Sequence, residues 1–284
     1  SRQADYVDSL GDAFSPSETM WGGHLALSKS LSPLTSAYVR FARGYKAGGF
    51  NMGLPLDLKQ YKEFETETLI NYEIGVKSYS SDHSVTTNMS VFYMDRQDQQ
   101  VNASVQDPDK PQRFIIYTAN ATSSSSYGLE LDTNWQINNE IALYATLGYL
   151  KATYKQYDYQ DKYGSIIDIS GRELAHAPNL SYSSGVIYRH NNGLFTNLNM
   201  SGKSDFYFSD SHAEKSQSTN IFNAIVGYEA ENWSINLWAR NLTDEKVATR
   251  GFYFGNEPDI DWKNKKYLRY DAPRHVGVTL NYQF

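Results

Sequence analysis

The sequence predicts an all-β fold, an antiparallel up-and-down transmembrane β-barrel with about eleven strands present. Three observations indicate this fold. Apolar and polar residues alternate in steps of two through most of the chain, short connections alternate with long ones, and the last alternating segment runs to Phe284. Alternation with a period of two gives each strand one apolar face, and a barrel that spans a membrane turns that face to lipid.

The composition argues against several other classes of protein. Hydrophobic residues make up 40% of the 284 residues, the mean hydropathy is -0.58, and no apolar run is as long as a transmembrane helix requires. The 23 Tyr suit strands and membrane interfaces. The chain has no Cys, which excludes disulfides, thiolate metal sites and a Cys nucleophile. A net charge of -6 argues against a nucleic-acid partner.

The predicted strands follow from this alternation. In the segment 85–93, Val85, Met89 and Val91 share one face, and Asn88 and Ser90 share the other. The same pattern recurs along the chain and no helical period interrupts it. We expect strands at 20–30, 35–46, 66–79, 84–97, 114–137, 141–154, 180–190, 194–205, 218–230, 232–242 and 273–284.

The connections between these strands alternate in length. Short ones hold turn residues, at Ser32-Pro33, Ser80-Ser81-Asp82, Asn138-Asn139, Asn191-Asn192-Gly193 and Glu231. Long ones fall between them, at 47–65, 98–113, 155–179, 206–217 and 243–272. One end of the sheet therefore has tight turns and the other has long loops, as in outer-membrane barrels with short periplasmic turns and long extracellular loops.

The last predicted strand explains why the sequence ends on an aromatic residue. Leu280, Tyr282 and Phe284 form an apolar stripe, whereas the end of a soluble domain is usually loose and polar. An ordinary edge strand is the alternative, but the alternating loop lengths favour the closing strand of a barrel.

Five segments resemble, in the same order, segments of the TonB-dependent outer-membrane receptors. They are YVRFARGYKAGGFN at 38–51, NYEIGVKS at 71–78, YGLEL at 127–131, ARNLTDEK at 239–246 and PRHVGVTL at 273–280. The end of the chain also resembles the signal read by the bacterial β-barrel assembly machine, with His275, Gly277, Leu280, Tyr282 and Phe284 at the matching positions.

The resemblance implies more than this chain contains. Such receptors have an amino-terminal plug domain, a short segment that contacts TonB, and a barrel of about 22 strands. We therefore interpret residues 1–284 as the carboxyl-terminal portion of the barrel, about half of its strands, with the plug missing. The implied function is TonB-energised uptake of a scarce ligand, with a ferric siderophore as the expected cargo. The implied partners are TonB, through the plug, outer-membrane lipid and lipopolysaccharide, and the assembly machine.

The candidate ligand-binding residues lie in the long loops, because loops on a rigid scaffold are where binding residues gather. Aromatic residues and two Arg suit a catecholate or citrate-like siderophore, and stacking on the aromatic rings would suit sugars equally. The candidates are Tyr157, Tyr159, Tyr163, Arg172, Phe206, Tyr207, Phe208, Arg250, Phe252, Tyr253 and Phe254. A girdle at the membrane interface, or packing between loops, is the alternative for these aromatics. Arg40, Glu73, Glu130 and Arg240 are expected to face the lumen and the plug.

Other functions were considered on the same residues. An autotransporter-type or a passive 12-stranded outer-membrane barrel is the main alternative, but residues 1–19 lack the pattern of the pore helix that an autotransporter needs. No local motif indicates an enzyme, and no cofactor is expected. Glu257, Asp259 and Asp261 could ligate Ca²⁺, yet they lack the Gly and Glu of a calcium loop, so no metal site is expected.

Overall fold

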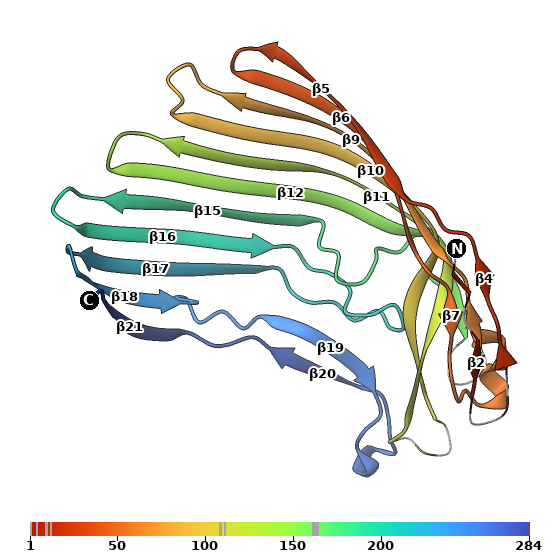
Figure 1. Cartoon of the computed structure of the whole chain (residues 1–284). Helices are drawn as coiled ribbons and strands as arrows, with labels where there is room; N and C mark the ends of the chain where they lie inside the picture. Colours follow the sequence, from red (N-terminus) through yellow and green to blue (C-terminus); the bar gives the residue numbers. More distant parts are fainter. Residues whose placement is uncertain are drawn as a thin grey trace.

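The computed structural model describes residues 2–3, 5–8, 11, 13–107, 110, 112–160 and 165–284. Eleven strands form one antiparallel sheet, as the alternation predicts, and their order in the sheet follows their order in the chain. Figure 1 shows this sheet curving from the edge strand β5 to the edge strand β21. Its strands are β5 (Gly23–Ser32), β6 (Thr35–Lys46), β9 (Glu67–Tyr79), β10 (Val85–Gln106), β11 (Phe114–Gln136), β12 (Ile141–Gln156), β15 (Leu180–Arg189), β16 (Leu194–Lys203), β17 (Thr219–Glu229), β18 (Trp233–Arg240) and β21 (His275–Tyr282).

Shorter elements lie outside this sheet. Five two-stranded ribbons pair β1 (Arg2–Gln3) with β4 (Ser17–Glu18), β2 (Tyr6–Val7) with β3 (Ala13–Phe14), β7 (Gly49–Phe50) with β8 (Glu63–Phe64), β13 (Asp158–Gln160) with β14 (Ile166–Asp168), and β19 (Ala248–Phe254) with β20 (Lys265–Tyr270). The described residues also form two 3₁₀ helices: η1 (Leu56–Tyr61), which follows Pro55, and η2 (Pro258–Ile260), which begins at Pro258. The long loops therefore contain local structure that the alternation alone does not predict.

The sheet has one apolar and one polar face, as predicted. Large apolar side chains stand exposed on the first, among them Leu25, Leu27, Val39, Ile74, Val91, Leu237, Val278 and Leu280. At the end with the short turns, exposed aromatic side chains share this face: Trp135, Tyr228, Trp233 and Tyr282. A continuous apolar face with aromatics at its rim matches the lipid-facing surface of an outer-membrane barrel. Among the described residues, no helix is long and apolar enough to cross a membrane.

Aromatic rings cover glycines on neighbouring strands at four places on the polar face. The pairs are Tyr38 with Gly75, Phe92 with Gly128, Tyr144 with Gly185, and Trp238 with Gly277, each directly opposite in the ladder. A Cβ atom added to Gly75 or Gly185 would lie 2.5 Å from the Cζ atom of the opposing Tyr. Glycine is needed here because the ring occupies the space that any other side chain would take.

The turn after β9 shows why the short connections hold Ser and Asp. The carboxylate of Asp82 accepts hydrogen bonds from the hydroxyls of Ser80 (2.5 Å) and Ser84 (2.8 Å) and from the backbone N–H of Ser84 (3.1 Å). These donors, Ser80 first, lower the pKa of Asp82 to about 2. The side chain thus replaces missing backbone partners in a tight turn.

We expect Asp82 to titrate at about pH 2 in the folded protein and Ser80→Ala to raise that value. The native state favours the ionised carboxylate, so its stabilising contribution is present above the unfolded pKa, about 3.9, and disappears as the pH falls through about 2. NMR titration of the Asp82 carboxyl carbon checks this. An ordinary pKa in both proteins would contradict the assigned hydrogen bonds.

The predicted loop 98–113 is wrong over most of its length. β10 continues to Gln106, and β10 and β11 pair without a long loop as far as Gln106 and Phe114. Val101, Ala103 and Val105 oppose Ala119, Tyr117 and Ile115 on one face of this extension. That apolar face packs against other loops rather than lipid, so pairing continues beyond the length that crosses a membrane. The long predicted strand 114–137, with a short partner, already signalled this extension.

Candidate functional site

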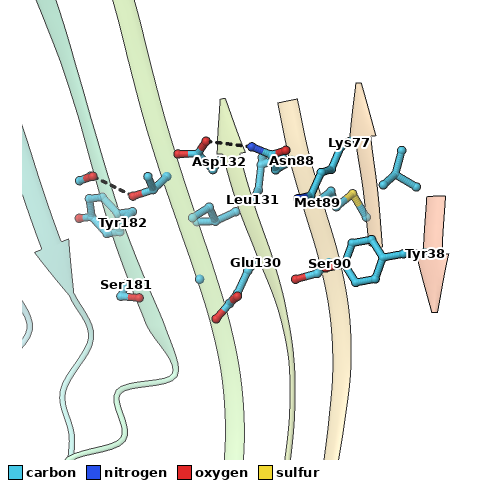
Figure 2. Close-up of a pocket in the computed structure, with 15 residues that line it drawn as sticks. Tyr38, Lys77, Asn88, Met89, Ser90, Glu130, Leu131, Asp132, Ser181 and Tyr182 are labelled. Atoms are coloured by element: carbon cyan, nitrogen blue, oxygen red, sulfur yellow. Dashed lines mark hydrogen bonds between the residues drawn. The ribbon is translucent and has the colours of Figure 1, made fainter. Parts of the chain in front are cut away.

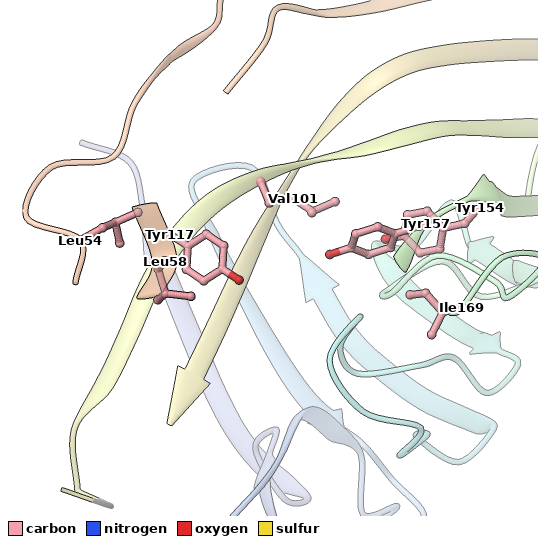
Figure 3. Packing of buried hydrophobic residues seen from close by; sticks show 8 residues of the cluster. Leu54, Leu58, Val101, Tyr117, Tyr154, Tyr157 and Ile169 are labelled. Carbon is pink, nitrogen blue, oxygen red and sulfur yellow. The ribbon is translucent and has the colours of Figure 1, made fainter. Parts of the chain in front are cut away.

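A buried apolar cluster joins three long loops at the end of the sheet opposite the short turns. Leu54 and Leu58 come from the 47–66 loop, Val101, Tyr117 and Ala119 from the β10–β11 hairpin, and Tyr154, Tyr157 and Ile169 from the segment around β12 to β14. Figure 3 shows these side chains reaching toward one another from separate segments. Burial raises the pKa of Tyr117 to about 12. The loops therefore have a small hydrophobic core of their own.

Asn51, the last residue of the YVRFARGYKAGGFN segment, attaches the 47–66 loop to β11. Its side-chain amide donates to the carbonyls of Tyr61 (2.6 Å) and Thr118 (2.7 Å) and accepts from the Thr118 N–H (2.9 Å). Asn51 thus satisfies the edge of β11 as a neighbouring strand would. The two glycines before it pack closely, since a Cβ on Gly48 would lie 2.6 Å from the carbonyl oxygen of Phe64.

We expect Asn51→Ala to weaken the attachment of the β10–β11 hairpin by about 1–3 kcal/mol, because it leaves partly buried backbone groups of Thr118 without partners. Hydrogen exchange at the Thr118 amide measures the effect. Asn102→Ala is the matched control, since Asn102 is exposed on the same hairpin. Equal protection of the Thr118 amide in both variants would contradict the role of Asn51 in attaching the loop to β11.

Arg172 connects the 157–179 loop with the 204–218 loop. Its guanidinium donates to the carbonyls of Ser209 (3.2 Å), Asp210 (2.6 Å) and His212 (3.2 Å). It also lies 4.9 Å from the ring centroid of Tyr207. The guanidinium of Arg172, predicted to bind an anionic ligand, is therefore bound by backbone oxygens and by an aromatic ring. These contacts cross-link the two loops.

Several predicted ligand aromatics are used in packing. Tyr157, Phe206 and Phe208 are each 4% exposed. The Tyr159 hydroxyl donates to the carbonyl of Ser211 (3.0 Å), and Tyr207 is stacked beneath Arg172 and Lys215. Tyr163 lies outside the described residues. The long loops at this end of the sheet form what we call the loop layer. In this part of it, the aromatic side chains pack between loops, which is the alternative that the sequence left open.

Burial also sets the protonation of the loop layer. The pKa of His176 and of His212 is lowered, in both cases mainly because burial disfavours the imidazolium form. Burial raises the pKa of the Tyr157 hydroxyl, and the negative charge of Asp210 adds to that effect. The two imidazoles and the phenol are therefore neutral at pH 7, and the cationic charge of this layer comes from its Arg and Lys residues.

The β19–β20 hairpin presents the predicted ligand residues that remain accessible. Phe252 and Tyr253 are 48% and 42% exposed, Arg250 is exposed, and Phe254 is half-buried against Phe114 at the tip of the β10–β11 hairpin. The Phe114 and Phe254 ring centroids are 5.0 Å apart and edge-on. This contact joins the projecting ends of two hairpins that are far apart in the chain.

The predicted lumen residues lie on the polar face of the sheet. Arg40 and Glu73 are directly opposite, with 4.0 Å between guanidinium and carboxylate, and Glu73 accepts a hydrogen bond from the Tyr38 hydroxyl (2.7 Å). Arg240 lies 5.4 Å from the ring centroid of Trp238 on the same face. Glu130 is exposed.

A hollow of about 580 Å³ lies over the middle strands of the polar face. Figure 2 shows Tyr38, Ser90, Glu130 and Ser181 around it, and the hydrogen bond of 3.4 Å between Asn88 and Asp132 at its upper side. These groups offer donors and acceptors to whatever lies against the face. Contact with a plug domain stays a prediction.

Three of the residues that shape this region escape the sequence analysis: Phe114, Tyr267 and Arg269. Tyr267 and Arg269 lie in β20, which the sequence analysis leaves inside the loop 243–272, and Phe114 opens a strand. The segment KYLRY does not alternate strictly, but its Tyr and Leu residues between charged ones could have indicated a short strand. Of the acidic residues considered for Ca²⁺, Glu257 pairs with Lys265 (2.9 Å), and the described residues contain no group of three or more potential ligands.

Comparison with known proteins agrees with this architecture. Residues 1–242 match the family model described as "TonB dependent receptor-like, beta-barrel". The pesticin receptor of Yersinia pestis is 24% identical over 248 residues, which are 87% of this chain and 35% of that protein. The pesticin receptor of Yersinia enterocolitica has the same identity and coverage.

Two solved structures have the same fold. The ferric yersiniabactin uptake receptor FyuA from Yersinia pestis superposes with a TM-score of 0.74 at 20% identity, covering 96% of this chain and 39% of that one. The siderophore receptor PiuA from Acinetobacter baumannii gives 0.69 at 17% identity, covering 95% and 36%.

The chain spans about a third of the length of the curated relatives that it matches, 35% in each case. The family match, in contrast, covers most of this chain. The apolar face with its aromatic rim, the alternating connections and the family match lead to one assignment. The chain belongs to the TonB-dependent receptor-like β-barrel family and lies in the bacterial outer membrane.

Proposed function

We propose that the chain is the carboxyl-terminal portion of an outer-membrane receptor that takes up a ferric siderophore with energy from TonB. The observation that carries this proposal is the family match over residues 1–242. Similarity to receptors for ferric yersiniabactin and other siderophores supports the cargo class. The function is that of a receptor and transporter and not of an enzyme.

The residues divide between proposed roles. Arg250, Phe252, Tyr253 and Phe254 are accessible on the β19–β20 hairpin and are proposed to contact cargo. Tyr157, Phe206 and Phe208 would support them from the buried layer. Arg40, Glu73, Glu130 and Arg240 on the polar face would meet a plug domain, through which TonB would act.

The exposed end of β21 supports a role in assembly. Val278, Leu280 and Tyr282 are exposed on the apolar face, whereas His275 and Gly277 meet Trp238 on the polar face. We propose that His275, Gly277, Leu280, Tyr282 and Phe284 present the signal for the β-barrel assembly machine. The apolar face would contact outer-membrane lipid and, in the outer leaflet, lipopolysaccharide.

Iron uptake in cells tests the proposed function. Cells that produce the protein are grown under iron limitation with radiolabelled iron bound to a panel of siderophores. Deletion of the gene is expected to abolish uptake of at least one ferric chelate, and loss of TonB is expected to have the same effect. Unchanged uptake of every chelate after the deletion would contradict the proposal.

A further inference from the structure

The most unusual charge arrangement in the loop layer lies on the β19–β20 hairpin. Arg250 and Arg269 are directly opposite across the ladder. Directly opposed like charges are destabilising, and both guanidiniums stay protonated. Both residues are exposed, and in the described part of the chain neither forms an ion pair with a carboxylate. Positive charge is thus concentrated here without compensation.

The pairing belongs to the regular register of the hairpin, which runs without a break from Phe254 opposite Lys265 to Arg250 opposite Arg269. The register shifts only beyond this pair, at Thr249, so that Ala248 faces Tyr270. The Thr249 hydroxyl donates to the Arg269 carbonyl (3.1 Å) and fixes the bulge. The bulge ends the regular ladder directly beside the two Arg residues.

Aromatic side chains continue the same face. Phe252 is opposite Tyr267 and Phe254 is opposite Lys265, and the Phe254 and Tyr267 ring centroids are 5.0 Å apart. Phe114 adds its ring edge from the β10–β11 hairpin. Glu257 neutralises Lys265 (2.9 Å) and accepts from the Tyr267 hydroxyl (3.1 Å), so the two Arg are the uncompensated cations.

The 204–218 loop contacts the opposite face of the hairpin, on which Tyr253 stays partly exposed. Gly251 packs against the Phe208 ring. The ring centroids of Tyr253 and His212 are 6.2 Å apart. Lys266 pairs with Glu214 (2.8 Å). These contacts hold the hairpin by one face and leave the face of Arg250, Arg269 and Phe252 open. The arrangement is a supported platform with two fixed cations beside a row of rings.

We propose that this platform binds an anionic ferric chelate with aromatic arms, of the catecholate or phenolate class. Arg250 and Arg269 contact the anionic oxygens, and Phe252, Phe254 and Tyr267 stack on the arms. The inference rests on the proposed function and adds to it the charge and aromatic character of the cargo. Relief of the repulsion between the two guanidiniums favours an anion over a neutral chelate.

The test compares two chelates in outer membranes from cells that produce the protein. One is a trianionic ferric tris-catecholate and the other an uncharged ferric tris-hydroxamate. The Arg250→Gln/Arg269→Gln variant is expected to bind the anionic chelate at least about tenfold more weakly, since charge-assisted hydrogen bonds are lost. The Lys246→Gln/Lys263→Gln variant removes the same charge elsewhere on the surface and is expected to bind as the unchanged protein does.

Two further readouts make the outcomes decisive. Arg250→Lys/Arg269→Lys is expected to recover part of the affinity, and added salt is expected to weaken binding of the anionic chelate. Unchanged affinity of the Gln variant for the anionic chelate, or a preference of the unchanged protein for the uncharged chelate, would overturn the inference. The deletion test of iron uptake reads out the proposed function separately, so the two failures are distinguishable.

Discussion

Replacing Gly128 by alanine is expected to destabilise the sheet, whereas replacing Gly44 by alanine is expected not to destabilise it. A Cβ atom on Gly128 would lie 2.7 Å from the Phe92 ring and would collide with the backbone carbonyl of Tyr149. A Cβ atom on Gly44, in β6 of the same sheet, meets nothing within 4 Å. Backbone cannot move away as a flexible side chain can, so the Gly128 variant must separate β11 from its neighbours.

The expected cost of Gly128→Ala is about 1–3 kcal/mol, the range of overpacking in a well-packed site. Gly44→Ala is expected to be neutral or to stabilise by up to about 1 kcal/mol, through the unfolded chain. Urea unfolding of the receptor from lipid vesicles gives both values. Equal stability of the two variants would show that the rings over the glycines contribute nothing to holding the strands together.

Replacing Tyr154 by alanine is expected to open the loop layer while the membrane-spanning sheet stays folded. Tyr154 is 2% exposed and its ring centroid lies 5.0 Å from that of Tyr157. Removing a buried aromatic costs about 3–5 kcal/mol, which is much of what so small a cluster can supply. Limited proteolysis and hydrogen exchange are expected to show opening at residues 165–171 and along the β10–β11 extension.

Tyr270→Ala provides the comparison, because Tyr270 is an exposed tyrosine in the same layer. It is expected to leave proteolysis unchanged. If both variants keep the shift in gel mobility that heating causes, the barrel itself is intact. If Tyr154→Ala exchanged its loop amides as slowly as Tyr270→Ala does, the buried cluster would not be what holds the loops.

The positions of the strands could be predicted from the sequence because their cause is local. Side chains of a strand point alternately to opposite faces, so Leu237 and Val278 on the lipid face follow from the residues beside them. The short turns could likewise be predicted from local turn-forming stretches such as Ser80-Ser81-Asp82. The family resemblance of the chain depends on such local stretches too, and the family match confirms it.

The use of each loop side chain could not be predicted in this way. Phe206 and Phe252 lie in loops that look equally aromatic in the sequence, yet one is buried and the other is 48% exposed. The difference depends on which segments pack together: Phe208 meets Gly251, and Phe114 meets Phe254. Contacts between residues so far apart in the chain leave no periodic pattern in the sequence.

By itself, then, the sequence determined the all-β class, the eleven strands of the sheet and their lipid and polar faces. Residues two positions apart in a strand share a face, so a short stretch of sequence is enough to show which face is apolar. The tertiary structure alone decided three other features: the length of the β10–β11 hairpin, the burial of Tyr157, and the opposition of Arg250 and Arg269. Each of these depends on register or packing between separate segments, and a shift of one residue in register changes which side chains meet.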